Sequence, residues 1–138
     1  MYEDDRALHH LGIELLEASP GRAILRLVIA ERHLNGLGVG HGGILFTLAD
    51  AAMAYASNTG LPDGDQALAT GGEIDFLAPA RVEDTITAEA TTVAVSGRTS
   101  VHDVRLCDTA GAVLAVFRGR TLRVTRPAAV DTGAGGRR

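Results

Sequence analysis

The chain has 138 residues, 46% of them hydrophobic and 22% charged, which fits a single globular domain with a buried core. A formal net charge of −4 disfavours a general nucleic-acid-binding role, because such proteins gather positive charge on one face. The single cysteine, Cys107, excludes an internal disulfide and a cysteine-based zinc site.

The N-terminal segment carries no sign of export or membrane insertion. It is acidic and lacks the basic start and apolar run of a signal peptide. No apolar stretch in the chain approaches the ~20 residues of a membrane-spanning helix. We therefore expect a cytoplasmic protein that does not enter a membrane. A short amphipathic helix is predicted next, over about residues 6–11.

Six strands are predicted from alternating or apolar runs bounded by turn residues. Their expected ranges are 13–18, 23–29, 67–76, 85–95, 99–106 and 113–125. The first pair is separated by Ser19-Pro20-Gly21, and the last three strands by Gly97 and by Thr109-Ala110-Gly111, all of them strong turn signals. Short connections of this kind favour a mostly antiparallel sheet.

One long helix is predicted over residues 42–57, between a glycine-rich loop and the stop signal Asn58-Thr59-Gly60. It is apolar on nearly every side, which is typical of a buried helix. The apolar residues are Ile44, Leu45, Phe46, Leu48, Ala49, Ala51, Ala52, Met53, Ala54 and Ala56. An antiparallel sheet needs a layer that covers one face. We expect an α+β fold, a sheet wrapped around this helix, as one domain over residues 1–126 with a disordered tail over 127–138.

Asp50 stands in the middle of this apolar helix. A buried carboxylate is costly unless it is paired or has a chemical role. No lysine or arginine lies within one helical turn of it, so no local salt bridge explains it. A hydrogen bond from a backbone amide or from a tyrosine of another segment would be a purely structural explanation.

The glycine-rich entrance to the helix favours a catalytic role for Asp50. A helix N-terminus presents unpaired N–H groups and the positive end of a dipole, which together can stabilise a carbonyl oxygen that gains negative charge. Gly42 and Gly43 carry no side chain that would block those groups. His41 and Asn35 precede them and could shape the same site or bond within it. With a buried carboxylate nearby, this set is typical of an acyl-transfer site.

Helix geometry places a condition on that site. Gly42 and Asp50 are eight residues apart on one helix, so at ~1.5 Å per residue they lie about 12 Å apart. Reacting atoms must approach within about 3–3.5 Å, so one carbonyl carbon cannot meet both groups of one chain. Two antiparallel copies of the helix would bring Gly42 of one chain to Asp50 of the other. The site hypothesis therefore predicts a homodimer.

The basic residues are all arginines, which bind phosphate oxygens in a bidentate way. Genome composition alone could explain the absence of lysine. An acidic protein that binds a polyanion must nevertheless do so with a local cluster. The candidates in the second half of the chain are Arg81, Arg98, Arg118, Arg120, Arg123 and Arg126.

Three stretches resemble the phenylacetate-degradation (PaaI-type) hotdog thioesterases. The first runs from Leu34-Asn35-Gly36 through His41-Gly42-Gly43 and Leu48-Ala49-Asp50 to Asn58. The others are residues 74–79 and 116–120. The resemblance extends from about residue 11 to 124. It implies a hotdog fold, hydrolysis of coenzyme A (CoA) thioesters with aryl or arylacetyl groups, a dimer that pairs into a tetramer, and no metal or redox cofactor.

The resemblance also implies residue roles. Asp50 corresponds to the catalytic carboxylate, Gly42 to the carbonyl-polarising amide, and Asn35 and His41 to the supporting polar pair. Looser matches are residues that contact CoA or orient water: Arg81, Gly97, Arg98, Thr99 and Thr70. Ala69 and Ala54 occupy two places where some relatives carry a water-orienting hydroxyl, so the group that positions water stays open. Asp50 could act as nucleophile or as general base.

Two alternatives compete with the thioesterase. A hotdog hydratase or dehydratase would have an aspartate and a histidine a few residues apart at the helix start. Asp50 has no histidine after it in its helix, and His41 lies nine residues before it. A non-catalytic acyl-CoA-binding protein would have little reason to bury a carboxylate beside a thioester.

Overall fold

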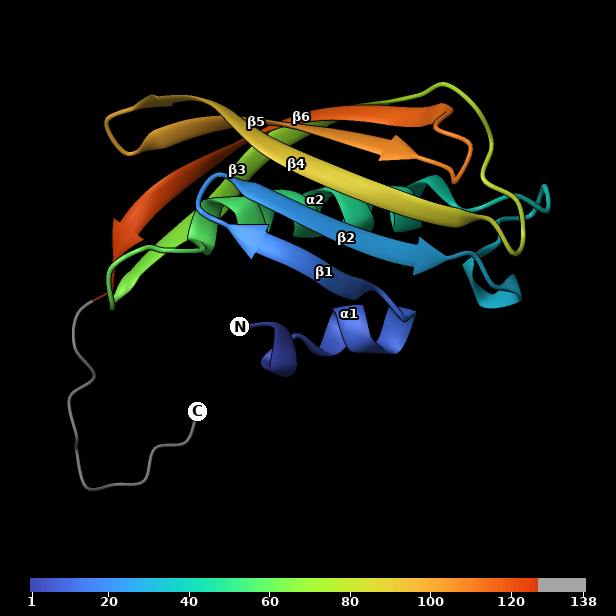
Figure 1. The fold of residues 1–138 in the computed structure, drawn as a ribbon, viewed down its shortest axis with the longest axis horizontal. Helices are drawn as coiled ribbons and strands as arrows, with labels where there is room; N and C mark the ends of the chain where they lie inside the picture. Colours follow the sequence, from blue (N-terminus) through green and yellow to red (C-terminus); the bar gives the residue numbers. More distant parts are fainter. Residues whose placement is uncertain (127–138) are drawn as a thin grey trace.

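A six-stranded sheet curves around one long helix, α2, in the computed structural model, which describes residues 1–126 (Figure 1). The helices are α1 (Arg6–Leu11) and α2 (Gly42–Asn58), with short 3₁₀ turns at Tyr2–Asp4 and Glu31–His33. The strands are β1 (Glu14–Ser19), β2 (Arg22–Val28), β3 (Asp65–Phe76), β4 (Thr85–Ser96), β5 (Thr99–Cys107) and β6 (Val113–Thr125). The predicted elements are all present, with ends that differ by one or two residues. The expected tail, residues 127–138, lies outside the described part of the chain.

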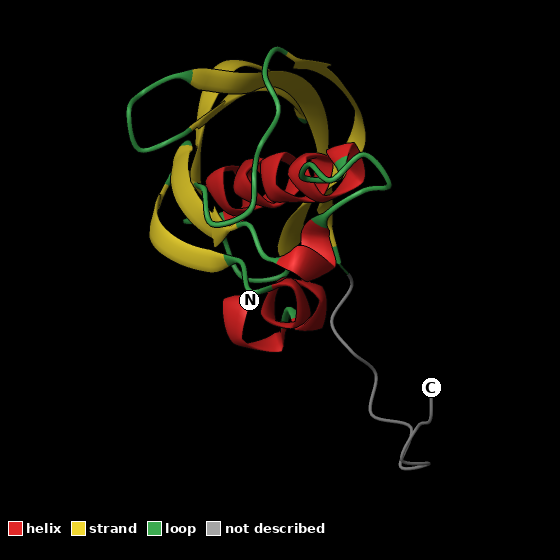
Figure 2. Ribbon diagram, turned by 90° about the vertical axis from the view of Figure 1, so that its right-hand side faces the viewer, coloured by secondary structure: helices red, strands yellow, loops and turns green. Residues whose placement is uncertain are grey.

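The strand order is β1-β2-β4-β5-β6-β3, and every neighbouring pair is antiparallel. The sequence predicts a mostly antiparallel sheet, and in residues 1–126 it is wholly so. β1 and β3 are the two edges. Figure 2 shows α2 enclosed by the curved sheet. This arrangement, a hotdog fold, confirms the predicted fold class.

The concave face of the sheet packs on α2. Along β4, the buried residues Ile86, Ala88 and Ala90 alternate with more exposed ones, as the period of two predicts. Small residues of α2, such as Ala49 and Ala52, are fully buried against this face. Their lack of bulk lets sheet and helix come close, which forms one continuous core.

The prediction that α2 is buried on nearly every side is wrong in one respect. Between Leu45 and Ala56, four residues remain partly or well exposed: Phe46, Thr47, Asp50 and Ala54. They recur every three or four residues and so form a single line along the helix, which we call the α2 stripe. The sheet covers the rest of the helix, but no element among the described residues covers this stripe. No helix of residues 1–126 is long and apolar enough to cross a membrane.

β3 lies beside the full length of α2. At one end, the side-chain amide of Asn58 donates to the Ala67 carbonyl and accepts from the Ala67 N–H, at 3.0 and 2.9 Å. At the other end, the ring of Phe76 lies against Gly42. The free edge of the sheet therefore borders the α2 stripe.

Candidate active site

The start of α2 leaves one backbone donor available. His41 caps the helix, and its Nδ1 atom accepts the Gly43 N–H at 2.9 Å. The His41 carbonyl accepts from Ile44 and Leu45. The Gly42 N–H has no acceptor among residues 1–126. Of the two glycines proposed as donors to a ligand, only Gly42 thus keeps a free N–H among the described residues. His41 uses its ring to cap the helix at Gly43.

Asn35 organises the loop that leads to this helix start. Its Oδ1 atom accepts from the N–H groups of Leu37 and Val39, at 2.9 and 3.3 Å, and its own N–H donates to the Val39 carbonyl. These bonds close the glycine-rich loop on itself. Asn35 thus shapes the loop that ends at the start of α2, and its role in the site stays a prediction.

Asp50 lies in the middle of the α2 stripe, half-buried. Its carboxylate has no hydrogen-bond or ion-pair partner among the described residues. Among residues 1–126, neither a backbone amide nor a tyrosine of another segment donates to it, so the purely structural explanation finds no support in this part of the chain. Burial raises the pKa of the Asp50 carboxyl, because desolvation disfavours the charged form. An unpaired carboxylate with a raised pKa is suited to accept a proton or to attack a carbonyl carbon.

Gly42 and Asp50 belong to one unbroken helix, so their separation along the axis is about 12 Å. They lie at the two ends of a two-turn section of α2. One chain alone therefore cannot bring both groups to one reacting carbon.

An aromatic side chain that the sequence did not single out borders Gly42. A Cβ atom placed on Gly42 would lie 3.0 Å from the Cζ atom of Phe76, so only glycine fits without moving the ring. Phe76 is 52% exposed. It ends a predicted strand, and no local pattern distinguishes such a residue from an ordinary core position. Only the pairing of β3 along α2 reveals its place.

The two arginines predicted to contact CoA lie at opposite ends of α2. Arg81 follows Ala80, whose carbonyl accepts from Gly40 just before the helix starts. Arg98 lines a pocket of about 280 Å³ near the C-terminal end of the helix. Neither side chain is bonded to a carboxylate among residues 1–126. One chain cannot direct both to a single phosphate group.

The looser candidates lie in two places, the β4–β5 hairpin and β3. Gly97 lines the same pocket as Arg98, whereas Thr99 begins β5 and is exposed. Thr70 lies in a β-bulge of β3, where its hydroxyl donates to the Arg120 carbonyl at 3.3 Å. The sequence therefore predicted two groups of residues that the fold separates.

Three other candidate arginines form ion pairs with carboxylates of the same chain. Arg118 pairs with Asp103, Arg120 with Glu73 and Arg123 with Asp65. Arg123 also borders the Arg98 pocket. The remaining candidates, which have no carboxylate partner in the described chain, are Arg81, Arg98 and Arg126.

A buried histidine forms the floor of the Arg98 pocket. His102 is 1% exposed, and its two ring nitrogens bond to the hydroxyls of Thr92 and Thr121, at 2.9 and 2.8 Å. Burial lowers its pKa, because desolvation disfavours the imidazolium. The sequence predicts only a strand residue at this position. Three separate strands are needed to bring the trio together.

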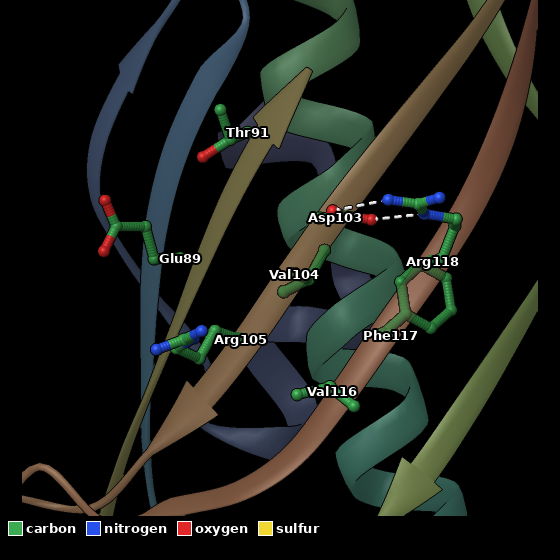
Figure 3. Close-up of a pocket in the computed structure, with 8 residues that line it drawn as sticks. All are labelled: Glu89, Thr91, Asp103, Val104, Arg105, Val116, Phe117 and Arg118. Atoms are coloured by element: carbon green, nitrogen blue, oxygen red, sulfur yellow. Dashed lines mark hydrogen bonds and ion pairs between the residues drawn. The ribbon is translucent and has the colours of Figure 1, made fainter. Parts of the chain in front are cut away.

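A larger hollow, of about 530 Å³, lies on the outer face of β4, β5 and β6 (Figure 3). Two of its lining residues, Asp103 and Arg118, form a bidentate ion pair, at 2.6 and 2.8 Å. Along these strands, side chains that face outward alternate with those that contact α2. The hollow is therefore on the opposite side of the sheet from Gly42 and Asp50. Residues 1–126 contain no cluster of three histidine, cysteine or acidic side chains suited to a metal.

Comparison with known proteins agrees with the fold and the motif. Residues 37–115, more than half of the chain, match the family described as the thioesterase superfamily. The acyl-coenzyme A thioesterase PaaI of Escherichia coli is 37% identical over 90% of this chain and 86% of its own. The structure of E. coli PaaI, from the phenylacetic acid degradation operon, superposes with a TM-score of 0.85 at 36% identity and covers 92% of this chain and 91% of its own.

Two further solved structures are similar to this chain. A PaaI protein of Thermus thermophilus is 33% identical over 87% of this chain and 100% of its own, with a TM-score of 0.81. A Streptococcus mutans protein bound to acetyl-CoA shares the fold, with a TM-score of 0.75 at 22% identity, and covers 83% of this chain and 90% of its own. The chain belongs to the thioesterase superfamily, as an acyl-CoA thioesterase of the PaaI type. It is thus a thioester hydrolase.

Proposed function

We propose that this thioesterase hydrolyses aryl and arylacetyl thioesters of CoA, such as phenylacetyl- or hydroxyphenylacetyl-CoA, to the free acid and CoA. Each active site joins Gly42 of one chain to Asp50 of a second copy. One observation carries the proposal: an unpaired amide donor and an unpaired carboxylate lie eight residues apart on the same helix, too far apart to act within one chain.

The chemistry follows from those two groups. The Gly42 N–H and the positive end of the α2 dipole bind the thioester oxygen and stabilise its negative charge as the carbonyl carbon is attacked. In one route the Asp50 carboxylate attacks that carbon, the C–S bond breaks, and CoA leaves as the thiolate. Water then hydrolyses the mixed anhydride and restores Asp50. In the other route Asp50 takes a proton from water, which attacks the same carbon.

The surface that would pair two chains is the α2 stripe with the adjoining edge of β3. An unpaired edge strand is usually protected, yet β3 is twelve residues long and lies beside three exposed apolar side chains. These are Leu68 at 51%, Phe76 at 52% and Leu77 at 61% exposure. Association of two copies along this surface would cover them and would set the two α2 helices side by side. Pairing of two such dimers into a tetramer remains our expectation.

The same antiparallel arrangement brings the two CoA-binding arginines together. Arg81 lies near the start of α2 and Arg98 near its end, so Arg81 of one chain and Arg98 of the other reach the same end of the helix pair. Both can then bind the phosphates of one CoA. Gly97 and Thr99 of the hairpin would contribute further contacts beside Arg98, and Thr70 would approach the substrate from β3. The pair Gly42 and Asp50 and the pair Arg81 and Arg98 thus both favour the antiparallel dimer, and this agreement supports the proposal.

Asp50→Asn tests the assignment, because it preserves shape while it removes the nucleophile or base. We expect turnover of phenylacetyl-CoA, followed as released thiol, to fall at least about a hundredfold, the loss typical of removing a catalytic acid or base. Unfolding temperature and binding of unreacted substrate should change little. Activity within a few-fold of the parent would refute the role of Asp50.

The non-catalytic alternative predicts a different result. A pure acyl-CoA-binding protein would bind phenylacetyl-CoA and release no thiol, with or without Asp50. Family membership and the raised pKa of the unpaired Asp50 carboxyl favour the enzyme. Assay of the parent protein on aryl and alkyl CoA thioesters therefore precedes every other measurement.

A further inference from the structure

We propose that the Phe46 side chains of two chains meet at the two-fold axis and close the inner end of each acyl pocket. The Phe46 ring would then set the longest acyl group that the enzyme accepts. This inference rests on the proposed function, because it uses the pairing of Gly42 with Asp50 of a second copy.

The position of the axis follows from that pairing alone. In two antiparallel helices related by a two-fold axis, each position faces one fixed position of the other copy. If residue 42 faces residue 50, the position that faces its own copy is midway between them. That position is Phe46. Its side chain lies on the exposed α2 stripe and is 36% exposed.

The Phe46 ring rests on a rigid base. It meets the ring of Phe117 edge-on, with centroids 5.3 Å apart and planes at 87°. Phe117 is buried and has no room to retreat: a Cβ atom on Gly72 or on Gly119 would lie 2.6 Å from its ring. Phe46 therefore cannot sink into the core to make space for a longer ligand. It presents a fixed wall on the α2 stripe.

The direction of the substrate follows from its charge. The CoA portion is large and anionic, so it extends outward to Arg81 and Arg98 at the ends of the helix pair. The acyl group, on the other side of the thioester carbon, then extends inward along the α2 stripe. From Gly42 to Phe46 is four residues, or about 6 Å at ~1.5 Å per residue. A benzyl or phenyl group fits that length, whereas a medium-length alkyl chain would collide with the Phe46 pair.

Acyl-chain preference tests the wall. Phe46→Ala and the milder Phe46→Leu would be compared with the parent on CoA thioesters of two to twelve carbons and on phenylacetyl-CoA. We expect the ratio of kcat/KM for decanoyl-CoA to that for phenylacetyl-CoA to rise about tenfold or more in Phe46→Ala, and less in Phe46→Leu. The control is Leu16→Ala, an exposed apolar residue on β1 at the opposite edge of the sheet, which should not shift the longest accepted chain. An unchanged chain-length limit in both Phe46 variants overturns the inference.

Crosslinking tests the axis without any activity assay. In a Cys107→Ser background, Phe46→Cys should link to its own copy with a short bismaleimide and give a covalent dimer. Ala54→Cys is the control on the same stripe: its two copies would lie sixteen residues apart along the helix pair, about 24 Å, beyond such a linker. A covalent dimer from Ala54→Cys and none from Phe46→Cys would refute the predicted axis. If the parent hydrolyses acyl-CoA and both Phe46 experiments fail, this inference alone is wrong; if the parent releases no thiol, the proposed function fails instead.

Discussion

At the scale of single residues, the site depends on polar groups that have no partner within their own chain. Among residues 1–126, the Gly42 N–H at the start of α2 and the Asp50 carboxylate on the α2 stripe are unpaired, and Arg81 and Arg98 have no carboxylate to bind. In the same part of the chain, every fully buried side-chain nitrogen and oxygen is paired. Unpaired groups at one surface indicate where a ligand or a second chain binds.

Replacement of the arginines proposed to bind CoA should raise KM more than it lowers kcat. Arg98→Ala and Arg81→Ala remove phosphate contacts remote from the carbonyl carbon, so we expect KM for phenylacetyl-CoA to rise about tenfold with kcat within about threefold. Kinetics on a short thioester without the nucleotide should be nearly unchanged. Arg118→Ala, whose guanidinium pairs with Asp103 on the outer face, is the control and should leave KM unaltered. If KM responds to neither Arg98 nor Arg81, the phosphates bind elsewhere.

His102 should make stability depend on pH. Burial lowers its pKa below the ordinary value of 6.5, so the unfolded chain takes up a proton more readily than the folded chain. The stabilisation from neutral His102 is therefore complete above about pH 6.5 and is lost as the pH falls toward the lowered pKa. His102→Gln keeps polar atoms near Thr92 and Thr121 but cannot titrate. Urea unfolding at several pH values should show the difference between parent and variant shrink between about pH 7 and 5; a constant difference would contradict this.

At the scale of elements, α2 is the centre of the proposed site, because one helix carries both proposed catalytic groups and the proposed axis between them. Its N-terminus supplies the free amide, its exposed stripe supplies the carboxylate, and its small residues let the sheet enclose the other sides. β3 completes the surface from the edge of the sheet. Glycines on β3 and β6 make room for the aromatic rings beneath the stripe.

The packing of those rings can be tested by adding a single methyl group. A Cβ atom on Gly119 would lie 2.5 Å from the Met53 sulfur and 2.6 Å from the Phe117 ring, so Gly119→Ala overfills the core. We expect the free energy of unfolding to fall by about 1–3 kcal/mol, measured by urea denaturation. Gly36→Ala is the matched control, because a Cβ atom there meets nothing within 4 Å. Equal effects of the two substitutions would show that the rings are not tightly held.

At the scale of the whole molecule, the proposed enzyme is complete only as a pair of chains. The exposed β3 edge, the α2 stripe and the separation of Gly42 from Asp50 all favour the same antiparallel dimer. In such a dimer every active site contains one Gly42 and one Asp50 from different chains. A substitution in one chain would therefore affect a site that it shares with the other.

Mixing two inactive variants should restore activity. Gly42→Pro removes the polarising N–H in the first turn of the helix, where proline is tolerated once the exposed Phe76 ring moves aside, and Asp50→Asn removes the carboxylate. Each homodimer should be nearly inactive. A mixed dimer has one site with both defects and one intact site, so co-expression should recover up to about half of the parent activity per mixed dimer if sites act independently. Mixed dimers that form and stay inactive would show that Gly42 and Asp50 do not meet across the interface.

Local sequence patterns were enough to predict the elements of this protein and to nominate the groups of its candidate site. Alternation in β4, the glycine turns and the apolar run of α2 are local patterns, because a strand repeats every two residues and a helix every 3.6. The motif around Gly42 and Asp50 is also local, since both residues lie on one helix. The separation of these two groups, and hence the predicted dimer, needed only the rise of that helix.

Features that depend on contacts between distant segments became visible only in the folded chain. Only the pairing of β3 with β6 makes β3 an edge strand, brings Phe76 onto Gly42 and leaves Phe46 exposed while Ala49 is buried. Likewise, His102 meets hydroxyls from two other strands, and Arg81 and Arg98 are carried to opposite ends of α2. Strand order is set by packing of the whole sheet around the helix, and residue types within a segment do not encode it. The chemistry is therefore local in the sequence, whereas the surfaces that shape and complete the site are products of the fold.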